Sequence, residues 1–244
     1  IGDRVFGITA GEAQAEYLIV DSSLLARIPA NLDFENAAAV PEVFITAYDA
    51  LVSQGGLAEG ETVLVHAAGS GVGLAAIQLA EAFSARTIGT SRTAEKLERC
   101  REFGLDEAVT MASATDLDRF AEENADSVDV VLDLVGAAYF QANLKLLAQK
   151  GRLLLIGLTS GRTAEFDLSI ALRKRAKIIG SVLRSRSLTE KAAAVRAFAA
   201  EVLPLIEEGT VRPNLERVYD AAEVRKAHEE MAANRNFGKL VLRF

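Results

Sequence analysis

Hydrophobic and polar residues follow two different periods along this chain. Short apolar runs rich in β-branched residues, such as Thr62–Val65, predict strands that are buried on both faces. Stretches in which apolar residues recur every three or four positions predict helices. The two patterns alternate between residues 60 and 207, which is typical of an α/β fold with a doubly wound parallel sheet. We expect strands at residues 62–65, 86–90, 107–110, 128–133, 151–157 and 177–181, and helices at residues 74–80, 94–103, 117–124, 140–147 and 188–207.

The segments on either side of this central pattern are richer in predicted strands. Residues 3–8 and 15–20 are β-rich runs joined by a polar turn, so we expect a hairpin there. Residues 34–51 predict a helix that Pro41 interrupts. The end of the chain predicts a strand, a helix and a strand. We therefore expect a nucleotide-binding domain at residues 41–208 and a β-rich domain made of residues 1–40 and 209–244.

Residues 67–73, which we call the glycine turn, are almost all small and join the first predicted strand to a helix. Such a turn forms a dinucleotide site, because glycines let the backbone approach a pyrophosphate and the helix N-terminus offers free N–H groups. The fingerprint G-x-G-x-x-G is altered here, since Leu74 stands at its third glycine. Read as A-x-x-G-x-x-G from Ala67, the turn has Ser70 in place of the middle glycine. The turn and its neighbours predict a Rossmann domain.

The residues after the second predicted strand distinguish NAD from NADP. A carboxylate there binds the ribose 2′-hydroxyl of NAD, whereas a basic residue accommodates the 2′-phosphate of NADP. Arg92 and Lys96 occupy this position, and the nearest carboxylate is Glu95. Because cations attract the phosphate, the charge pattern favours NADPH. The alternative interpretation is that both residues are solvated charges at the start of a helix.

Composition excludes several other functions. A net charge of −7 argues against a surface for nucleic acid. One cysteine and two histidines argue against a disulfide framework and a metal cluster. The sequence has no long apolar run or basic leader, so we expect a cytoplasmic protein that binds no membrane. His66, beside the glycine turn, is either a general acid or a structural residue held by partners, and the second interpretation is favoured.

No catalytic triad or paired-carboxylate motif stands out in the sequence. Hydride transfer is compatible with this absence, because the cofactor carries the reaction and the protein positions it against the substrate.

Several short motifs together resemble the medium-chain dehydrogenase/reductases, in their zinc-free quinone oxidoreductase branch. They lie at residues 2–5, 37–41, 46–47, 65–73, 151–152, 157 and 236–239. Residues 70–73 and 183–186 are most similar to the tumour-suppressor-inducible quinone oxidoreductases, which are related to zeta-crystallin.

This resemblance implies a Rossmann domain with a GroES-like catalytic domain, NADPH as cofactor, quinones as substrates and a homodimer. It implies that Ser70, Gly71 and Val72 hold the pyrophosphate, and that Thr93 and Lys96 hold the 2′-phosphate. Val43 and Thr46 would lie near the nicotinamide. The remaining cofactor contacts would come from Leu134, Gly136, Ile156, Gly157, Leu158, Ser181, Val182, Leu183 and Asn236.

Three departures from the family pattern matter. Met111 replaces a tyrosine at the 2′-phosphate end, and Arg92 replaces a small residue there. Family members also carry roughly 70–80 residues before the position of Ile1, and these supply much of the catalytic domain and a tyrosine near the substrate. We expect the GroES-like domain to be incomplete in this chain.

Two other functions stay open at this point. The same fold serves enoyl reductases that act on acyl thioesters, since a fold does not fix a substrate. A non-catalytic module that binds NADPH is the third hypothesis. The apolar edge strand near residues 178–183 is a candidate dimer contact.

Overall fold

The computed structural model describes residues 1–244, which form two compact units. The first unit contains Ile1–Tyr48, Ser70–Ala75 and Val182–Phe244, and the second contains Asp49–Gly69 and Ala76–Ser181. Each unit is a set of segments that contact one another more than the rest of the chain, which is not the same as a domain with its own function. The predicted domain limits, at residues 1–40, 41–208 and 209–244, therefore stay a prediction.

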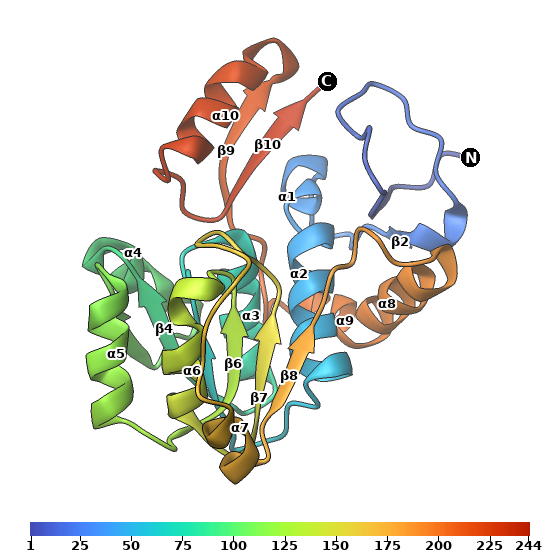
Figure 1. The fold of residues 1–244 in the computed structure, drawn as a ribbon. Coiled ribbons are helices and arrows are strands. Elements are labelled where there is room, and N and C mark those ends of the chain that lie inside the picture. Colours follow the sequence, from blue (N-terminus) through green and yellow to red (C-terminus); the bar gives the residue numbers. More distant parts are fainter. The chain divides into compact units, whose positions relative to one another are not determined.

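The second unit is built on a six-stranded parallel sheet (Figure 1). Its strand order is β5-β4-β3-β6-β7-β8, so the first strand in sequence lies inside the sheet and the chain winds outward in both directions from it. This order is that of the dinucleotide-binding Rossmann fold, in which ligands bind beyond the carboxyl ends of the strands at the point where the direction reverses. The predicted α/β class is confirmed. The strands are β3 (Thr62–Val65), β4 (Arg86–Ser91), β5 (Glu107–Thr110), β6 (Val128–Asp133), β7 (Leu147–Leu155) and β8 (Lys177–Gly180).

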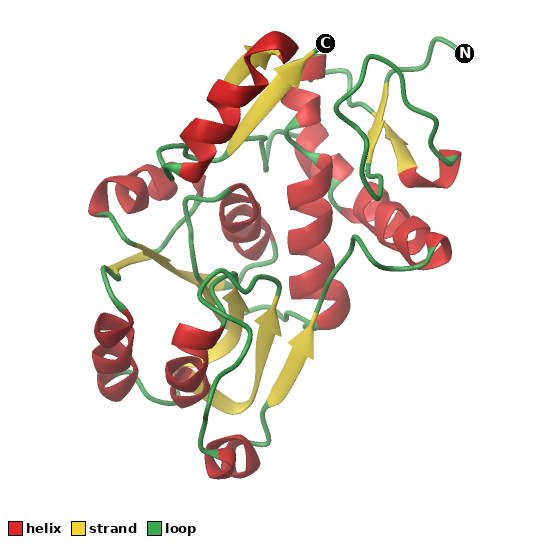
Figure 2. Ribbon diagram, turned by 45° about the horizontal axis from the view of Figure 1, so that its top comes forward, coloured by secondary structure: helices red, strands yellow, loops and turns green.

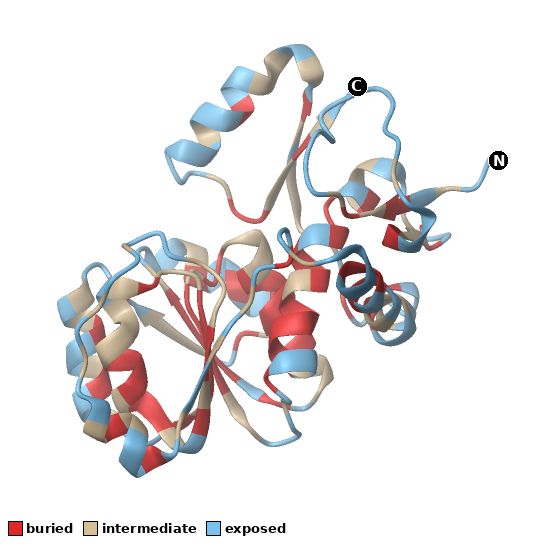
Figure 3. Ribbon diagram, turned by 45° about the vertical axis from the view of Figure 1, so that its right-hand side comes forward, coloured by how far each residue is buried: buried red, intermediate tan, exposed pale blue.

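The inner strands are buried on both faces, as their uninterrupted apolar sequences predict (Figure 3). On one face, Leu64, Val131 and Leu153 belong to a core cluster that includes side chains of α5 (Ala114–Glu123), α6 (Phe140–Leu146) and α7 (Leu168–Lys174). Val63 and Val65 alternate with Leu64 and are fully buried as well. The sheet is therefore a rigid platform for the residues that follow each strand.

The helical segments of the second unit agree with the predicted pattern, with three differences. α5 begins at Ala114, three residues early, because Ser113 and Asp116 form a capping box. A π-helical segment, Asp49–Gln54, follows α2, and α7 was not predicted. The helices are α4 (Ala94–Cys100), α5 (Ala114–Glu123), α6 (Phe140–Leu146) and α7 (Leu168–Lys174), while α3 (Gly71–Ala82) begins in the first unit.

The first unit contains helices and two small sheets (Figure 2). β1 (Val5–Gly7) pairs antiparallel with β2 (Leu25–Arg27), while β9 (Leu215–Asp220) pairs in parallel with β10 (Lys239–Arg243). The strand, helix and strand predicted at the end of the chain are confirmed. The helices are α1 (Phe34–Ala38), α2 (Pro41–Tyr48), α8 (Leu188–Glu201), α9 (Leu203–Glu207) and α10 (Val224–Ala232).

Two expectations for the first unit were wrong. The hairpin between residues 3–8 and 15–20 does not form, because the second run has no buried face: Tyr17 and Ile19 are 91% and 102% exposed. The single helix expected at residues 188–207 ends at Glu201, and α9 starts anew with Pro204 in its first turn. Proline has no N–H for a helix interior but fits a first turn.

None of the helices combines the length and the apolar character that crossing a membrane requires.

Candidate functional site

α3 begins within the glycine turn, at Gly71. The Ser70 hydroxyl accepts a hydrogen bond from the N–H of Gly73 at 3.1 Å, and its carbonyl accepts one from Leu74 at 2.9 Å. Ser70 therefore caps the helix, which explains how a serine serves where the fingerprint has a glycine. The capping bond engages the N–H of Gly73, and the N–H groups of Gly71 and Val72 are left for an anion beyond the helix.

Gly71 is enclosed by two side chains of the first unit. A Cβ added to Gly71 would lie 2.9 Å from Cγ1 of Val43 and 2.8 Å from Cδ of Lys239. A parallel bridge between Ser70 and Gly238 holds the C-terminal segment beside the turn. The structure thus brings the predicted residues Val43, Ser70 and Gly71 together, and it adds Lys239.

Lys239 was not predicted as a site residue. Its stem packs over Gly71, and its amine forms no hydrogen bond or ion pair in the structure. Burial lowers the pKa of the Lys239 amine, and the charge of Glu42 raises it by a smaller amount. A bound anion would stabilise the protonated amine, so Lys239 suits a phosphate at the start of α3.

The other predicted residues of the first unit differ in how they are placed. The Thr46 hydroxyl donates to the carbonyl of Glu42 at 2.6 Å, one turn earlier in α2. Asn236 donates to the carbonyl of Gly238 at 3.0 Å and so shapes the segment next to Ser70. Val72 is half-buried, Leu183 is buried and Val182 is 62% exposed. Their roles toward a cofactor stay predictions.

In the second unit, β4 ends at Ser91 and is followed by Arg92 and Thr93, which are both exposed. Thr93 is the N-cap of α4, yet its hydroxyl makes no capping hydrogen bond. Arg92 forms no ion pair, and half-buried Lys96 follows in α4. The cations and the hydroxyl predicted for a 2′-phosphate are thus grouped after one strand.

Met111 is placed differently from these residues. Its side chain is 1% exposed and belongs to the apolar core, while its N–H donates to the carbonyl of Ser91 at 2.8 Å. The structure shows a packing role for Met111, and its role toward a cofactor stays a prediction.

The loops after β6 and β7 pack closely on each other. Gly136 has a φ of 91°, and a Cβ there would lie 3.0 Å from Cα of Leu158. A Cβ on Gly157 would lie 2.5 Å from the carbonyl oxygen of Leu134. Because side chains larger than hydrogen do not fit, both glycines keep these backbones close. Predicted residues Leu134, Gly136, Ile156, Gly157 and Leu158 therefore form one group at the carboxyl edge of the sheet.

Ser181, the last predicted residue of the second unit, continues that edge after β8. Its N–H donates to the carbonyl of Leu155 at 3.0 Å, and its hydroxyl donates to buried Asp49 at 3.2 Å.

His66 lies at the centre of a buried polar network. Its Nε2 is 2.7 Å from Oδ1 of Asn143, and its Nδ1 is 2.8 Å from the Thr90 hydroxyl. Asn143 donates from its amide nitrogen to Asp133 at 3.1 Å, so its oxygen faces His66 and accepts from Nε2–H. Burial lowers the pKa of His66, against the smaller effect of Asp133, which favours a neutral ring. In the neutral ring Nδ1 accepts from the Thr90 hydroxyl.

The same network shapes the loop after β6. The other oxygen of Asp133 accepts from the N–H groups of Val135 and Gly136, at 2.7 and 3.0 Å. The structural interpretation of His66 is confirmed, since it is fully buried with both ring nitrogens engaged. Sequence reasoning missed Asn143 because its partner His66 is 77 positions away, and with it missed the link from His66 to Asp133.

The chain is similar to a large group of dehydrogenases and reductases. The model of the family described as zinc-binding dehydrogenase matches residues 71–200, more than half of the chain. A quinone oxidoreductase of Pseudomonas aeruginosa is 33% identical over 99% of this chain and 75% of its own length. The spectinabilin polyketide synthase system protein NorB of Streptomyces orinoci is 36% identical over 99% of this chain, which spans only 11% of NorB.

Solved structures that superpose on this chain also include dehydrogenases and reductases. A mycobacterial protein complexed with NADPH superposes with a TM-score of 0.86 at 30% identity, covering 99% of this chain and 74% of that one. An NAD-dependent alcohol dehydrogenase gives a TM-score of 0.81 at 34% identity, covering 95% and 65%. The enoyl reductase JamJ gives 0.77 at 25% identity, covering 92% and 67%. The chain belongs to the zinc-binding dehydrogenase family, among the medium-chain dehydrogenase/reductases, as the sequence predicted.

The family's name implies zinc, but the residues of this chain do not fit it. No three His, Cys, Asp or Glu side chains come together in a geometry that could hold a metal ion. Cys100, the one cysteine, is fully buried, and burial raises the pKa of its thiol to about 12.

Proposed function

We propose that this chain binds NADPH and forms part of a reductase that transfers hydride from NADPH to a quinone. The enclosed start of α3, where Gly71 lies against Val43 and Lys239, is the observation that carries the cofactor site. Bound NADPH would supply the hydride. The residues of this chain would bind and orient it.

In the first unit, the N–H groups of Gly71 and Val72 are suited to the pyrophosphate. Ser70 holds the helix start in shape, and Lys239 adds a cation whose protonated form the phosphate would favour. In the second unit, Arg92, Thr93 and Lys96 are suited to the 2′-phosphate. The choice of NADPH over NADH rests on this group, since a carboxylate is absent from the end of β4.

Replacement of Lys96 tests the choice of cofactor. We expect Lys96→Ala to weaken NADPH binding by about 10- to 100-fold and to leave NADH almost unchanged, because a charged hydrogen bond contributes about 1.5–3 kcal/mol. Arg99→Ala, which removes a cation from the last turn of the same helix, is the matched control. Fluorescence titration with both nucleotides measures the effect. Equal losses for NADPH and NADH would refute the phosphate role.

A quinone is favoured as acceptor for two reasons. Quinone oxidoreductases match nearly all of this chain and three quarters of their own length. In addition, His66 has both ring nitrogens engaged, so it is not available to give the proton that reduction of a carbon–carbon double bond needs. The quinone's oxygens can take their proton from water.

Reduction of an enoyl thioester is the second candidate. The comparisons support it as well, since the polyketide synthase protein NorB is 36% identical to this chain and the enoyl reductase JamJ 25%, beside 33% for the P. aeruginosa quinone oxidoreductase. Stopped-flow oxidation of NADPH with 1,4-benzoquinone, 1,2-naphthoquinone and crotonyl-N-acetylcysteamine compares the two. A clear preference for the thioester would replace the quinone proposal. Binding of NADPH without oxidation by any of the three would indicate a non-catalytic module.

We also propose that the chain forms a homodimer through the edge of its large sheet. β8 is the last strand of that sheet, and Ile178 on it is 42% exposed. An open edge with apolar side chains invites pairing with another strand. Light scattering after size-exclusion chromatography should show a dimer for the wild type and a monomer for Ile178→Lys. A wild-type monomer would contradict the proposal.

A further inference from the structure

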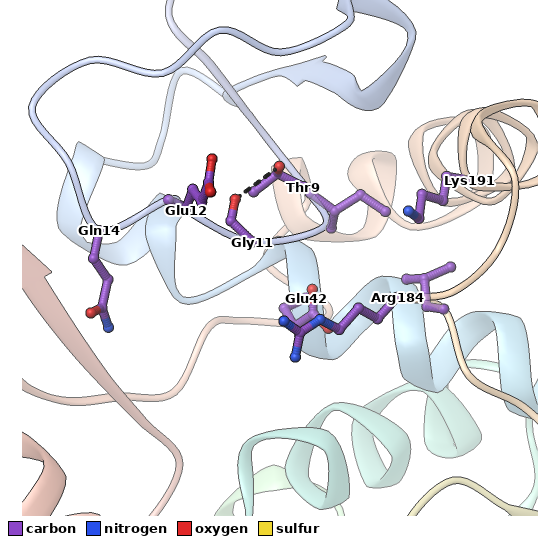
Figure 4. A pocket seen from close by; sticks show the side chains of 10 residues that line it. Thr9, Gly11, Glu12, Gln14, Glu42, Arg184 and Lys191 are labelled. Atoms are coloured by element: carbon purple, nitrogen blue, oxygen red, sulfur yellow. Dashed lines mark hydrogen bonds between the residues drawn. The ribbon is translucent and has the colours of Figure 1, made fainter.

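A cavity of about 350 Å³ lies within the first unit (Figure 4). One wall is the loop that contains Ile8, Thr9 and Gly11, and another is the segment with Leu183 and Arg184. Glu42 of α2 and Lys191 of α8 complete its lining. The volume is at the small end of the range for ligand pockets and suits a molecule with one or two rings.

Lys191 is the unusual member of this lining. It is only 8% exposed, yet its amine makes no hydrogen bond and no ion pair in the structure. Figure 4 shows its side chain extending from α8 toward the loop that carries Thr9. No buried side-chain nitrogen in the structure lacks a partner, so the stem of Lys191 is buried while its ammonium is reached by solvent through the cavity. A ligand oxygen in the cavity can replace that water on the ammonium.

The other charges of the cavity restrict what that ligand can be. Arg184 is already engaged, since its Nε donates to the carbonyl of Ala10 at 3.1 Å and so holds the loop in place. Glu12 and Glu42 bring two carboxylates to the same lining. A ligand with several negative charges would meet repulsion, whereas a neutral or singly charged one could place a single oxygen on Lys191.

We propose that this cavity binds a small cyclic acceptor and that Lys191 anchors it through one carbonyl or anionic oxygen. The inference deepens the proposed quinone reductase by assigning the acceptor to residues of the first unit. Glu42 is adjacent in sequence to Val43, which encloses the start of α3, so cavity and cofactor residues share helix α2.

Lys191 would act on the charge that develops during reduction. A quinone that accepts a hydride, with its two electrons, becomes a hydroquinone monoanion, and one proton from water completes the hydroquinone. An ammonium next to one oxygen binds this anion more strongly than the neutral quinone, which favours the reaction.

Binding of benzoate, which has a ring and one anionic oxygen group, tests the anchor without any turnover. Ligand-observed NMR titration compares benzoate with benzyl alcohol on the full chain. We expect benzoate to bind the wild type, and Lys191→Met to bind it at least about tenfold more weakly, because a charged hydrogen bond is lost. Lys191→Arg should retain most of the binding. Arg196→Met, which removes an exposed cation from the same helix, is the control.

The outcomes separate this inference from the proposed function. Loss of benzoate binding in Lys191→Met, with normal binding in Arg196→Met and Lys191→Arg, supports the anchor even if no quinone is reduced. Equal binding in the wild type and Lys191→Met overturns it, even if quinones are reduced. Binding of benzyl alcohol as strong as that of benzoate overturns it as well. A thermal unfolding curve of each variant shows that the chain remains folded.

Discussion

His66 and Lys191 are both buried nitrogen-bearing side chains, but their surroundings are opposite. His66, in the second unit, is fully buried and has partners for both ring nitrogens. Lys191, in the first unit, is 8% exposed and has no partner for its amine. The sequence left His66 open between a general acid and a structural residue and favoured the second. The structure assigns a structural role to it and draws attention to the lysine.

Whether the polar atoms of a side chain have protein partners distinguishes residues that stabilise the fold from residues that are available to bind a ligand. A satisfied polar network rigidifies its surroundings and makes each member costly to remove. Lys191 has no protein partner and lines a cavity, so its ammonium is free to bind a ligand oxygen there. The network around His66 ends on the N–H groups of Val135 and Gly136, so it fixes a predicted cofactor loop without touching a ligand itself.

The largest expected effect is that of Asn143→Ala. The substitution leaves the Nε2–H of His66 and one oxygen of Asp133 without partners in the core, so we expect the free energy of unfolding to fall by about 3–5 kcal/mol. Urea denaturation measures it. Asn124→Ala, which removes a bond to the carbonyl of Phe120 at a helix end, should cost about 1 kcal/mol or less. Similar losses in both variants would contradict a network centred on Asn143.

Arg152→Ala should have the next largest effect. Arg152 bonds both oxygens of Glu61, at 2.7 and 2.6 Å, and the carbonyls of Gly55 and Gly56, at 2.8 and 3.1 Å. Its side chain is 11% exposed, so we expect a loss of about 2–3 kcal/mol. The exposed pair of Arg86 and Glu107 is the control, with a loss below about 1 kcal/mol for Arg86→Ala. Equal values in urea denaturation would mean that burial of the pair does not matter.

The titration of His66 should make stability depend on pH. Burial lowers the pKa of His66 in the folded chain below its ordinary value of 6.5, so the unfolded chain binds the proton first. The stabilisation is therefore present above about pH 6.5 and is lost as pH falls, by at most about 1.4 kcal/mol per pH unit. Urea denaturation between pH 5.5 and 7.5 measures this slope. His66→Gln should flatten it, and an unchanged slope would assign the dependence to other groups.

The smallest expected change in stability is that of Lys191→Met, and it tests the difference between Lys191 and His66 directly. Lys191→Met keeps an apolar stem of similar length and removes an ammonium that has no protein partner, so the free energy of unfolding should change by less than about 1 kcal/mol. Differential scanning calorimetry detects such a change. A loss of more than 1 kcal/mol would place Lys191 among the residues that hold the fold, beside His66.

The sequence by itself determined the alternating strands and helices, the class of fold and the position of the glycine turn. These features depend on local periodicity and on small residues in short runs, which act within about ten positions. The same is true of Arg92, Thr93 and Lys96, because they follow one strand directly. The hairpin expected between residues 3–8 and 15–20 was wrong because β1 pairs instead with β2, and which strands pair is a non-local choice.

Only the tertiary structure decided which polar side chains are satisfied. His66 and Asn143 are 77 positions apart, so no local pattern could join them. Lys239, near the end of the sequence, packs against Gly71. Thr9 and Lys191 line the same cavity although they are also far apart in the sequence. The hydrogen bonds and desolvation of a buried group depend on all its neighbours in space, and these are set when the fold closes around it.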